Sequence, residues 1–563
     1  MKIRRRRTFA CLATAFALVL GVAACTEEAP PAKAGELPVL EITGTGGGPA
    51  ANFNPFLPTS ALNAYSAVNM IYEPLVQFNI LKENSTYPWL ATSWQWADGD
   101  ETLTFKLRDG VNWSDGQPFT SADVVFTFEL LKKYAALNVN GVDFQEITAP
   151  DDHTVVVTFA KPAFTQLYAI AGLTPIVSKH EWEKVPDPTK FLDPNPIGTG
   201  PFVYKSYNPQ LLVLTRNEKF WQPGKPEVQQ LNYHGLSFET AGIQLLSGEL
   251  DWADYFFTTG SNKEFVNKNK DNHFWYPPTG VVSLVPNHTV WPLSELPVRQ
   301  AISAALDRQQ ICDLGQYTFN PPVKTPTGLL LPNYESALDP KYKDLQIVED
   351  KAKAKQLLEL DGFKLNKSGL YEKNGKPLSL TLTVPSGYKD WMNSSGIIAQ
   401  QLKTVGIGVT VKGVSVDDWS QRVAQGHYDL TLGSSNTGAS PFVAYQGWLD
   451  YSQSGPVGQN ARANVERFND PTTHKLLTEY QAAGTDEARL TALRGLQTVM
   501  VEQTPIIPLV YSVDWAMYRS AKVTGWPTEA DPYAPAAPYT PGRGDRRTAA
   551  EAGGPMRGAA RCG

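Results

Sequence analysis

The clearest hydrophobic pattern in the chain is an alternation of apolar and polar residues between Thr102 and Leu107, which predicts a strand. Leu103, Phe105 and Leu107 share one face of that strand and are candidate core residues. Aspartate–glycine dipeptides at 109–110 and 115–116 predict two tight turns directly after it, because glycine adopts a positive φ at no steric cost.

A helix is predicted to begin after these turns. Thr120 suits the N-cap, and Asp123 follows at the spacing of a capping box, close to the positive end of the helix. Val124, Phe128 and Leu131 supply the apolar stripe of this helix. The segment from Leu107 to Phe128 therefore indicates structural framework, and none of its patterns is typical of a reaction centre.

Further along the chain, strand patterns and helix patterns alternate, which predicts an α/β fold. A predicted helix contains Val298, Ala301, Ile302, Ala305 and Leu306, with Pro297 at its start. Three more strands are predicted at 154–160, 379–384 and 505–511, and a helix at 397–405 ends at Gly406 and leads into a strand with Ile407, Val409 and Val411 on one face.

Several motifs in this chain resemble those of family 5 extracytoplasmic solute-binding proteins, the oligopeptide, dipeptide and nickel receptors of ABC importers. The segment 107–128 resembles the hallmark of that family. The other matching segments follow in family order: the turn Asn195–Phe202 (NPIGTGPF), the strand end Arg216–Trp221 (RNEKFW) and the two helices Val298–Ile311 and Ala352–Phe363. The resemblance covers roughly residues 36 to 527 and is specific for the family rather than for a ligand.

This resemblance implies a two-lobed α/β fold of the periplasmic-binding-protein type, with a hinge and an accessory subdomain. A mature chain of this length also exceeds one hydrophobic core. The boundaries implied are 36–57, 194–292 and 504–530 for lobe I, 58–193 for its accessory subdomain, and 293–503 for lobe II, so that the strand at 505–511 returns the chain to lobe I.

The resemblance also implies a function. A receptor of this family catalyses nothing and needs no cofactor, because ATP hydrolysis belongs to partner subunits. We expect a monomer that captures an oligopeptide between its lobes and delivers it to a membrane permease, which would recognise the closed form.

The N-terminus predicts export. Lys2 and Arg4–Arg7 form a basic region, and residues 8–24 are apolar or small throughout but too few to span a bilayer comfortably. The following Val22-Ala23-Ala24-Cys25 resembles a bacterial lipobox, in which Cys25 becomes the lipidated N-terminus. Residues 1–24 are thus predicted to be a lipoprotein signal peptide and 25–35 a tether, which places the protein outside the cytoplasm, anchored to the cell membrane by an N-terminal lipid.

Charge agrees with that location. The first 24 residues hold five basic and no acidic side chains, so the remainder has 45 basic and 56 acidic residues and a net charge of −11. That balance, without basic clusters interleaved with aromatics, disfavours a nucleic-acid partner.

Cys312 is predicted to be a small core residue, and a disulfide to Cys562 is left open. Residues 535–563 are predicted to be a disordered tail, because this segment is too poor in large aliphatic residues to offset its ordering entropy.

Catalytic and metal-binding patterns are missing from the sequence. It contains no Walker-type phosphate loop, no HExxH and no GxSxG elbow, and its seven histidines include no pair at ligand spacing. We therefore predict neither an enzyme nor a metal site. The acidic group Asp98, Asp100 and Glu101 is interpreted as a solvated turn.

Aromatic residues are the better candidates for ligand contact. The chain has 14 Trp and 23 Tyr residues, and indole rings are large, rigid surfaces for stacking. Trp275, Trp391 and Trp448 lie in contexts that look like loops, and they are therefore predicted to face the cleft.

One segment bears on the ligand directly. In the peptide-binding branch of the family, a strand before the lobe II cleft carries an aspartate that binds the α-ammonium of the peptide. The matching run here is 429–442, where Ser434 stands in place of a tryptophan and Thr437 in place of that aspartate, and no carboxylate lies between Asp429 and Asp450. An ammonium group would lack its usual partner, so Ser434, Asn436 and Thr437 are predicted to present neutral groups to the ligand.

Two ligand classes therefore stay open. Asp254 or Asp418 would restore an ammonium site for a peptide. Alternatively, neutral side chains with many aromatics suit an oligosaccharide of the cello or manno type, as some family members bind. The segments 52–56, with Asn54 as a candidate contact, and 71–75 resemble that second branch. A signalling or scaffold lipoprotein without transport is the remaining alternative.

Overall fold

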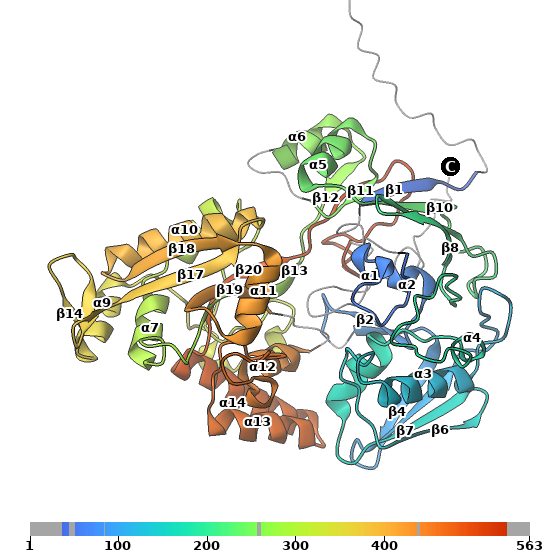
Figure 1. Ribbon diagram of the computed structural model, residues 1–563, viewed down its shortest axis with the longest axis horizontal. Helices are drawn as coiled ribbons and strands as arrows, with labels where there is room; N and C mark the ends of the chain where they lie inside the picture. Colours follow the sequence, from blue (N-terminus) through green and yellow to red (C-terminus); the bar gives the residue numbers. More distant parts are fainter. Residues whose placement is uncertain (1–35, 44–50, 84, 256–260, 436–439, 537–563) are drawn as a thin grey trace, which may run out of the picture. The chain divides into compact units, whose positions relative to one another are not determined.

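The computed structural model describes residues 36–43, 51–83, 85–255, 261–435 and 440–536. Within these ranges, no helix has the length and apolarity required to cross a membrane. The mixed α/β architecture expected from the sequence is confirmed, since strands and helices alternate along the described part of the chain, where the strands form two large sheets and three smaller ones (Figure 1).

The first large sheet, called here the N-terminal sheet, has seven strands drawn from both ends of the chain. β1 runs parallel to β10 and β11, while the other pairs are antiparallel. Its strands, in spatial order, are β12 (Asn272–Phe274), β21 (Met517–Arg519), β11 (Trp252–Ala253), β1 (Val39–Thr43), β10 (Gln230–His234), β9 (Leu211–Arg216) and β8 (Phe202–Asn208). α5 (Phe238–Ser247) and α6 (Ser261–Lys268) follow β10 and β11.

The second large sheet, the C-terminal sheet, has five strands. They are β18 (Gly408–Val414), β17 (Ser379–Pro385), β19 (Leu430–Ser434), β13 (Pro278–Pro286) and β20 (Ile507–Val513). β17, β18 and β19 are parallel, and β13 is antiparallel to both of its neighbours. Both faces are buried: one packs with α7 (Leu296–Ala304), α9 (Lys351–Leu360) and α10 (Lys389–Thr404), the other with α12 (Pro441–Leu449) and α14 (Asp486–Gln503).

This pairing changes one expectation about the return strand. The strand predicted at 505–511 was assigned to lobe I, but β20 pairs with β13 in the C-terminal sheet, so that assignment was wrong. Its apolar residues are buried among helices of the C-terminal part, and only β21 after it joins the N-terminal sheet. The boundaries at 293 and 503 therefore do not follow the sheets, and the division into lobes stays a prediction.

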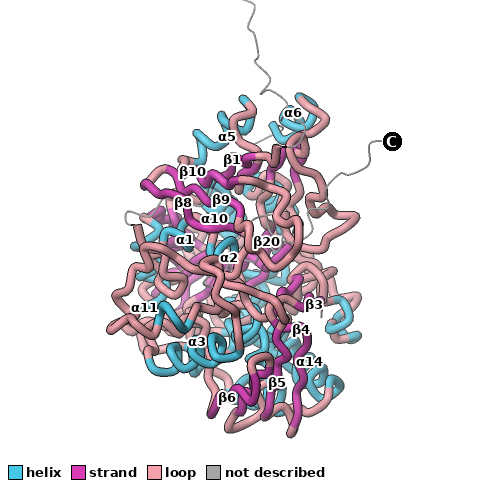
Figure 2. Tube along the Cα trace, turned by 90° about the vertical axis from the view of Figure 1, so that its right-hand side faces the viewer, coloured by secondary structure: helices cyan, strands magenta, loops and turns pink. Residues whose placement is uncertain are grey.

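A four-stranded antiparallel sheet lies within the range expected for the accessory subdomain. Its strands are β4 (Ala91–Ala97), β5 (Thr102–Leu107), β7 (Thr154–Thr158) and β6 (Glu146–Asp151), and α3 (Ser121–Lys133) follows β5. Figure 2 shows β4, β5 and β6 of this sheet together. The predicted strand and helix are confirmed, with Leu103, Phe105 and Leu107 buried and Val124, Phe128 and Leu131 buried on α3.

The remaining elements are short strands and helices. The strands are β2 (Val76–Asn79), β3 (Ser85–Pro88), β14 (Lys364–Leu365), β15 (Tyr371–Lys373) and β16 (Lys376–Pro377). The helices are α1 (Ala61–Ala64), α2 (Val68–Ile71), α4 (Lys179–Trp182), α8 (Arg308–Gln310), α11 (Val416–Gln425), α13 (Pro471–Ala482), the 3₁₀ turns η1 (Phe164–Gln166), η4 (Glu335–Ala337), η5 (Pro340–Tyr342) and η6 (Tyr451–Gln453), and the π-helical turns η2 (Tyr168–Gly172) and η3 (Ile311–Gly315).

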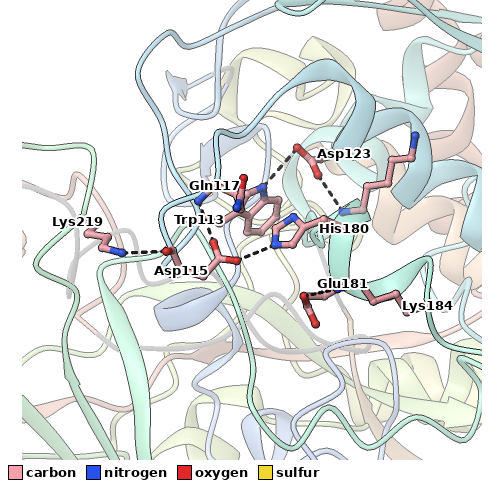
Figure 3. A network of polar contacts seen from close by, with 9 residues as sticks. Trp113, Asp115, Gln117, Asp123, His180, Glu181, Lys184 and Lys219 are labelled. Carbon is pink, nitrogen blue, oxygen red and sulfur yellow. Dashed lines mark hydrogen bonds and ion pairs between the residues drawn. The ribbon is translucent and has the colours of Figure 1, made fainter.

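The hallmark segment is held by polar contacts around the start of α3 (Figure 3). Asp123 Oδ2 accepts from the backbone N of Thr120 at 2.9 Å, and Oδ1 accepts from Lys179 N at 2.9 Å. The indole of the buried Trp113 also donates to Asp123, at 3.4 Å. Burial raises the pKa of Asp123, since desolvation outweighs these donors. The framework interpretation of this segment agrees with every one of these contacts.

More exposed contacts in the same view hold the turn at Asp115, which precedes α3. His180 Nε2 and Asp115 Oδ2 lie 2.8 Å apart, and Lys219 Nζ donates to the backbone oxygen of Asp115 at 3.0 Å (Figure 3). Three segments separated in sequence thereby meet at one turn.

The glycine-rich turn at 195–202 packs directly against the chain after α2. Gly200 N donates to Ile71 O at 2.9 Å, and Ser114 N donates to Gly198 O at 2.9 Å. Next to it, the buried carboxyl group of Glu73 accepts from the indole of Trp89 at 2.7 Å and from that of Trp221 at 3.2 Å. The hallmark segment, the turn at 195–202 and the strand end at 216–221 thus form one continuous packing unit.

Candidate functional site

Two short segments, 275–277 and 514–516, carry the chain between the two large sheets. They run side by side and bond to each other: Trp275 N donates to Ala516 O at 3.0 Å, and Asp514 N donates to Pro277 O at 3.0 Å. These segments, called here the crossing segments, connect β12 to β13 and β20 to β21.

Both sheets direct the carboxyl ends of their parallel strands toward the crossing segments. In the N-terminal sheet, β11 ends at Ala253, which pairs with Met517 at the start of β21. In the C-terminal sheet, β19 ends at Ser434, which pairs with Val282 in the middle of β13, and β13 begins directly after a crossing segment. Open α/β sheets bind ligands outside the carboxyl ends of their strands. The crossing segments and these strand ends together form the candidate site.

A cluster of four aromatic side chains surrounds the crossing segments. The Tyr276 ring centroid lies 5.0 Å from that of Phe274, 5.2 Å from Phe319 and 4.9 Å from Trp515. Tyr276, Phe319 and Trp515 are half-buried, and Phe274 is exposed. Rings with partly exposed faces can stack on a bound molecule. Sequence reasoning missed this cluster, and the one nearby signal was the strand predicted at 505–511, which ends four residues before Trp515.

Polar groups accompany these rings. Tyr276 Oη donates to Tyr255 O at 3.1 Å and accepts from Asn262 Nδ2 at 2.9 Å. Burial raises the pKa of Tyr276, and the nearby Asp254 raises it further, so this phenol stays neutral. Thr279 Oγ1 donates to Asp514 Oδ1 at 3.3 Å. The candidate site therefore combines aromatic faces with two carboxylates and a phenol.

Two more polar side chains lie beside the same edge. Asn320 is only 3% exposed, yet its Oδ1 has no hydrogen-bond partner within the described part of the chain. It precedes Pro321, whose carbonyl accepts from Tyr511 N of β20 at 2.8 Å. Asp390 begins α10 after the carboxyl end of β17, and burial raises its pKa to about 6. Neither residue carried a sequence signal.

Among the residues predicted to contact ligand, Trp275 lies in a crossing segment and is half-buried. Ser434 ends β19 and is also half-buried. Asn54 lies elsewhere: it is buried, its Nδ2 donates to Phe191 O at 2.8 Å and to Pro188 O at 3.2 Å, and its Oδ1 accepts from Phe56 N at 3.0 Å. Its amide is thus used by the protein backbone.

The loop contexts assigned to two tryptophans were wrong. Trp391 belongs to α10 and Trp448 to α12, and each is 8% exposed. Trp391 packs edge-on against Trp419 at 5.7 Å, and Trp448 packs against Tyr445 at 5.9 Å. Both side chains belong to the hydrophobic cores on the two faces of the C-terminal sheet.

The other predicted residues separate into two groups. Asn436, Thr437 and Cys25 lie outside the described residues. Of the two acids considered as substitutes for the missing aspartate, Asp418 is paired with Arg422 Nε at 2.9 Å on α11, whereas Asp254 directly follows β11 in the candidate site. Of the sequence candidates, Trp275 therefore lies in a crossing segment, while Ser434 and Asp254 lie at the ends of β19 and β11.

Comparison with known proteins decides the family. The model of bacterial extracellular solute-binding proteins, family 5, matches residues 85–456, which is about two thirds of the chain. The chain belongs to this family. It is therefore an extracytoplasmic substrate-binding protein of an ABC importer and not an enzyme, and permease partners are implied.

Curated relatives of this family 5 protein are moderately similar over most of their length. The nickel-binding periplasmic protein of Escherichia coli is 26% identical over 487 residues, covering 81% of this chain and 86% of the relative. The probable D,D-dipeptide-binding periplasmic protein of the same organism is also 26% identical, covering 78% and 81%.

One of the solved relatives has been determined with an oligosaccharide bound. A periplasmic oligopeptide-binding protein of Thermotoga maritima is 28% identical with a TM-score of 0.81, covering 89% of this chain and 96% of its own. The mannohexaose-bound structure of that protein has a TM-score of 0.76 at 29% identity, covering 88% and 94%. These matches confirm the periplasmic-binding-protein fold.

Proposed function

We propose that this family 5 receptor captures a neutral oligosaccharide and delivers it to its permease. The observation that carries the proposal is the half-buried aromatic cluster of Tyr276, Phe319 and Trp515, at the carboxyl edges of both large sheets. Aromatic rings bind the apolar faces of sugar rings, while hydroxyl, amide and carboxylate groups bind their hydroxyls.

Two further observations support this ligand class. The sequence has no carboxylate between Asp429 and Asp450. The position at which peptide receptors bind an α-ammonium is therefore neutral here. In addition, the Thermotoga maritima protein, which is 29% identical, has been solved with mannohexaose bound.

An oligopeptide, predicted from the sequence resemblance, is the second candidate. Asp254 and Asp514 favour it, because both lie at the candidate site and a carboxylate there can pair with an ammonium group. Relatives named for D,D-dipeptide and murein peptide binding support the same class.

A thermal-shift screen distinguishes these ligands. We expect manno- or cello-oligosaccharides of two to six units to raise the melting temperature, and di- to pentapeptides to leave it unchanged. Stabilisation by peptides alone would refute the sugar and favour the second candidate. No stabilisation by either class would refute both ligand proposals and favour a solute of another class or a scaffold or signalling role.

Variants test the location. Trp515→Ala should weaken binding of the stabilising ligand about tenfold, since loss of one stacked ring costs roughly 1–1.5 kcal/mol. Trp291→Ala is the matched control, because Trp291 is partly exposed and stacks on Phe363 rather than on the cluster. Equal losses in both variants would argue against the assigned site.

We also propose that Cys25 carries the lipid that anchors the receptor to the cell membrane. The lipobox-like sequence Val22–Cys25 after an apolar segment supports this anchor. Expressed in a bacterial host, the protein should partition into detergent and Cys25→Ala should partition into the aqueous phase. Aqueous partitioning of both would refute the anchor.

A further inference from the structure

One cation joins α14 to the four-stranded sheet. Arg489, in the first turns of α14, donates from Nη2 to Asp100 Oδ2, 389 residues away, and its guanidinium carbon lies 4.0 Å from the centre of the Phe164 ring. The two charged side chains are only 12% and 16% exposed. The guanidinium is thus enclosed by a carboxylate and an aromatic face.

The local chain prepares the position of Asp100. Asp98, Gly99 and Asp100 all adopt positive φ in the turn between β4 and β5. Ala163 N donates to Asp100 O at 2.9 Å, which fixes this turn beside the segment that begins η1 with Phe164. The acidic group was interpreted as a solvated turn; that holds for Asp98 and Glu101, but Asp100 is withdrawn from solvent by its pairing.

A second contact lies between the same two parts of the chain. Ser336 Oγ, in η4, donates to Glu83 Oε2 in the connection between β2 and β3. η4 is attached to α14, because Gln497 Nε2 donates to Ala337 O at 2.8 Å. The segment formed by η4 and α14 therefore contacts the β2–β3 connection through Ser336 and the four-stranded sheet through Arg489.

We propose that these two contacts form a clasp, centred on Arg489 and Asp100, which favours the closed receptor without touching the solute. Within the described residues, the chain passes between the large sheets only at the two short crossing segments, so a change of backbone angles there would separate them. The clasp joins chain on opposite sides of the crossing segments and would break in that separation. A contact present in one state shifts the equilibrium by its own free energy.

The expected effect is moderate. Exposed ion pairs change an equilibrium little and fully buried ones change it strongly. The Arg489–Asp100 pair lies between these limits and has the Phe164 ring in addition, so its loss should lower the closed-to-open ratio about tenfold.

Small-angle X-ray scattering of the solute-free protein tests the clasp. Arg489→Ala and Asp100→Asn should each raise the radius of gyration, and the charge swap Arg489→Asp with Asp100→Arg should return it toward the wild-type value. Asp486→Asn is the matched control, because Asp486 is 98% exposed and binds Arg489 within its own helix at 2.9 Å.

Asp100→Asn is nearly isosteric and keeps the test valid if removal of Arg489 unfolds the protein. Equal radii of gyration for the wild type and Asp100→Asn would overturn the proposal, as would an equal increase in Asp486→Asn. Scattering is recorded without solute, so failure of the clasp is separable from failure of the ligand assignment.

Discussion

Replacing Gly198 by alanine should disrupt the packing unit formed by the hallmark segment, the turn at 195–202 and the strand end at 216–221. A Cβ at this position would lie 1.8 Å from Ile71 O and 2.5 Å from Ile71 C. Carbon and oxygen atoms need at least about 3.3 Å even in a close contact, so one of the two backbones must move by more than about 1 Å. The constraint comes from close approach, since neither segment can yield by rotating a side chain.

The cost follows from the bonds that this movement breaks. Gly200 N to Ile71 O and Ser114 N to Gly198 O are both 2.9 Å long and hold the turn on either side. Losing two buried hydrogen bonds costs about 1–3 kcal/mol each, and the overpacking about 1–3 kcal/mol more. Gly198→Ala should therefore destabilise the protein by roughly 5 kcal/mol, a large part of typical stability.

Thermal unfolding checks this estimate. For a chain of this length, ~5 kcal/mol lowers Tm by about 5 °C if all of it unfolds together, and by more if the N-terminal part unfolds alone. Gly396→Ala is the control: Gly396 lies within α10 and a Cβ there would contact nothing, so alanine should stabilise by about 0.5–1 kcal/mol. A Gly198→Ala protein that melts with the wild type would refute the reasoning.

Three further variants test the framework. Burial raises the pKa of the Glu73 carboxyl group from 4.5 to about 8, so the folded protein binds this proton more tightly than the unfolded chain does. The contribution of Glu73 to stability therefore declines as pH rises from about 5 to 8, and Glu73→Gln should flatten the decline in Tm over that range. Plots of Tm against pH that run parallel for the variant and the wild type would contradict the raised pKa. Arg308→Ala removes a buried guanidinium that bonds the carbonyl of Pro508 at 2.8 Å, and denaturant unfolding should show a loss of about 3–5 kcal/mol, whereas a loss within 0.5 kcal/mol would contradict the role. Gly280→Ala places a Cβ 2.5 Å from Ser435 O, directly after β19, so it should lower the free energy of unfolding by about 1–3 kcal/mol. It should also weaken solute binding in titration calorimetry, and an unchanged affinity would show that the end of β19 is not part of the binding site.

The framework was predictable because its signals are local. Asp123 is three residues from the Thr120 cap that it satisfies, and the alternating strand at 102–107 was confirmed as β5 with the expected residues buried. Turn chemistry and side-chain period act over a few residues, so one sequence is sufficient to predict them.

The candidate site was predictable only in part because its members come from distant segments. Tyr276, Phe319 and Trp515 converge through the pairing of β13 with β20, which no short window contains. Trp391 was misassigned because the first half of α10 reads KDWMNSSG, which lacks an apolar stripe of helical period although Ser394 is buried there. For Asp100, the decisive partner is 389 residues away.

The hydrogen bonds between the crossing segments also restrict how the receptor can move. Two independent links would allow the connected parts to twist and slide as well as bend. Because Trp275 bonds Ala516 and Asp514 bonds Pro277, the links behave as one narrow ribbon. A paired ribbon bends most easily across its flat face, so we expect a single axis of motion, and each return to the closed form would bring the same residues of the two sheets into register.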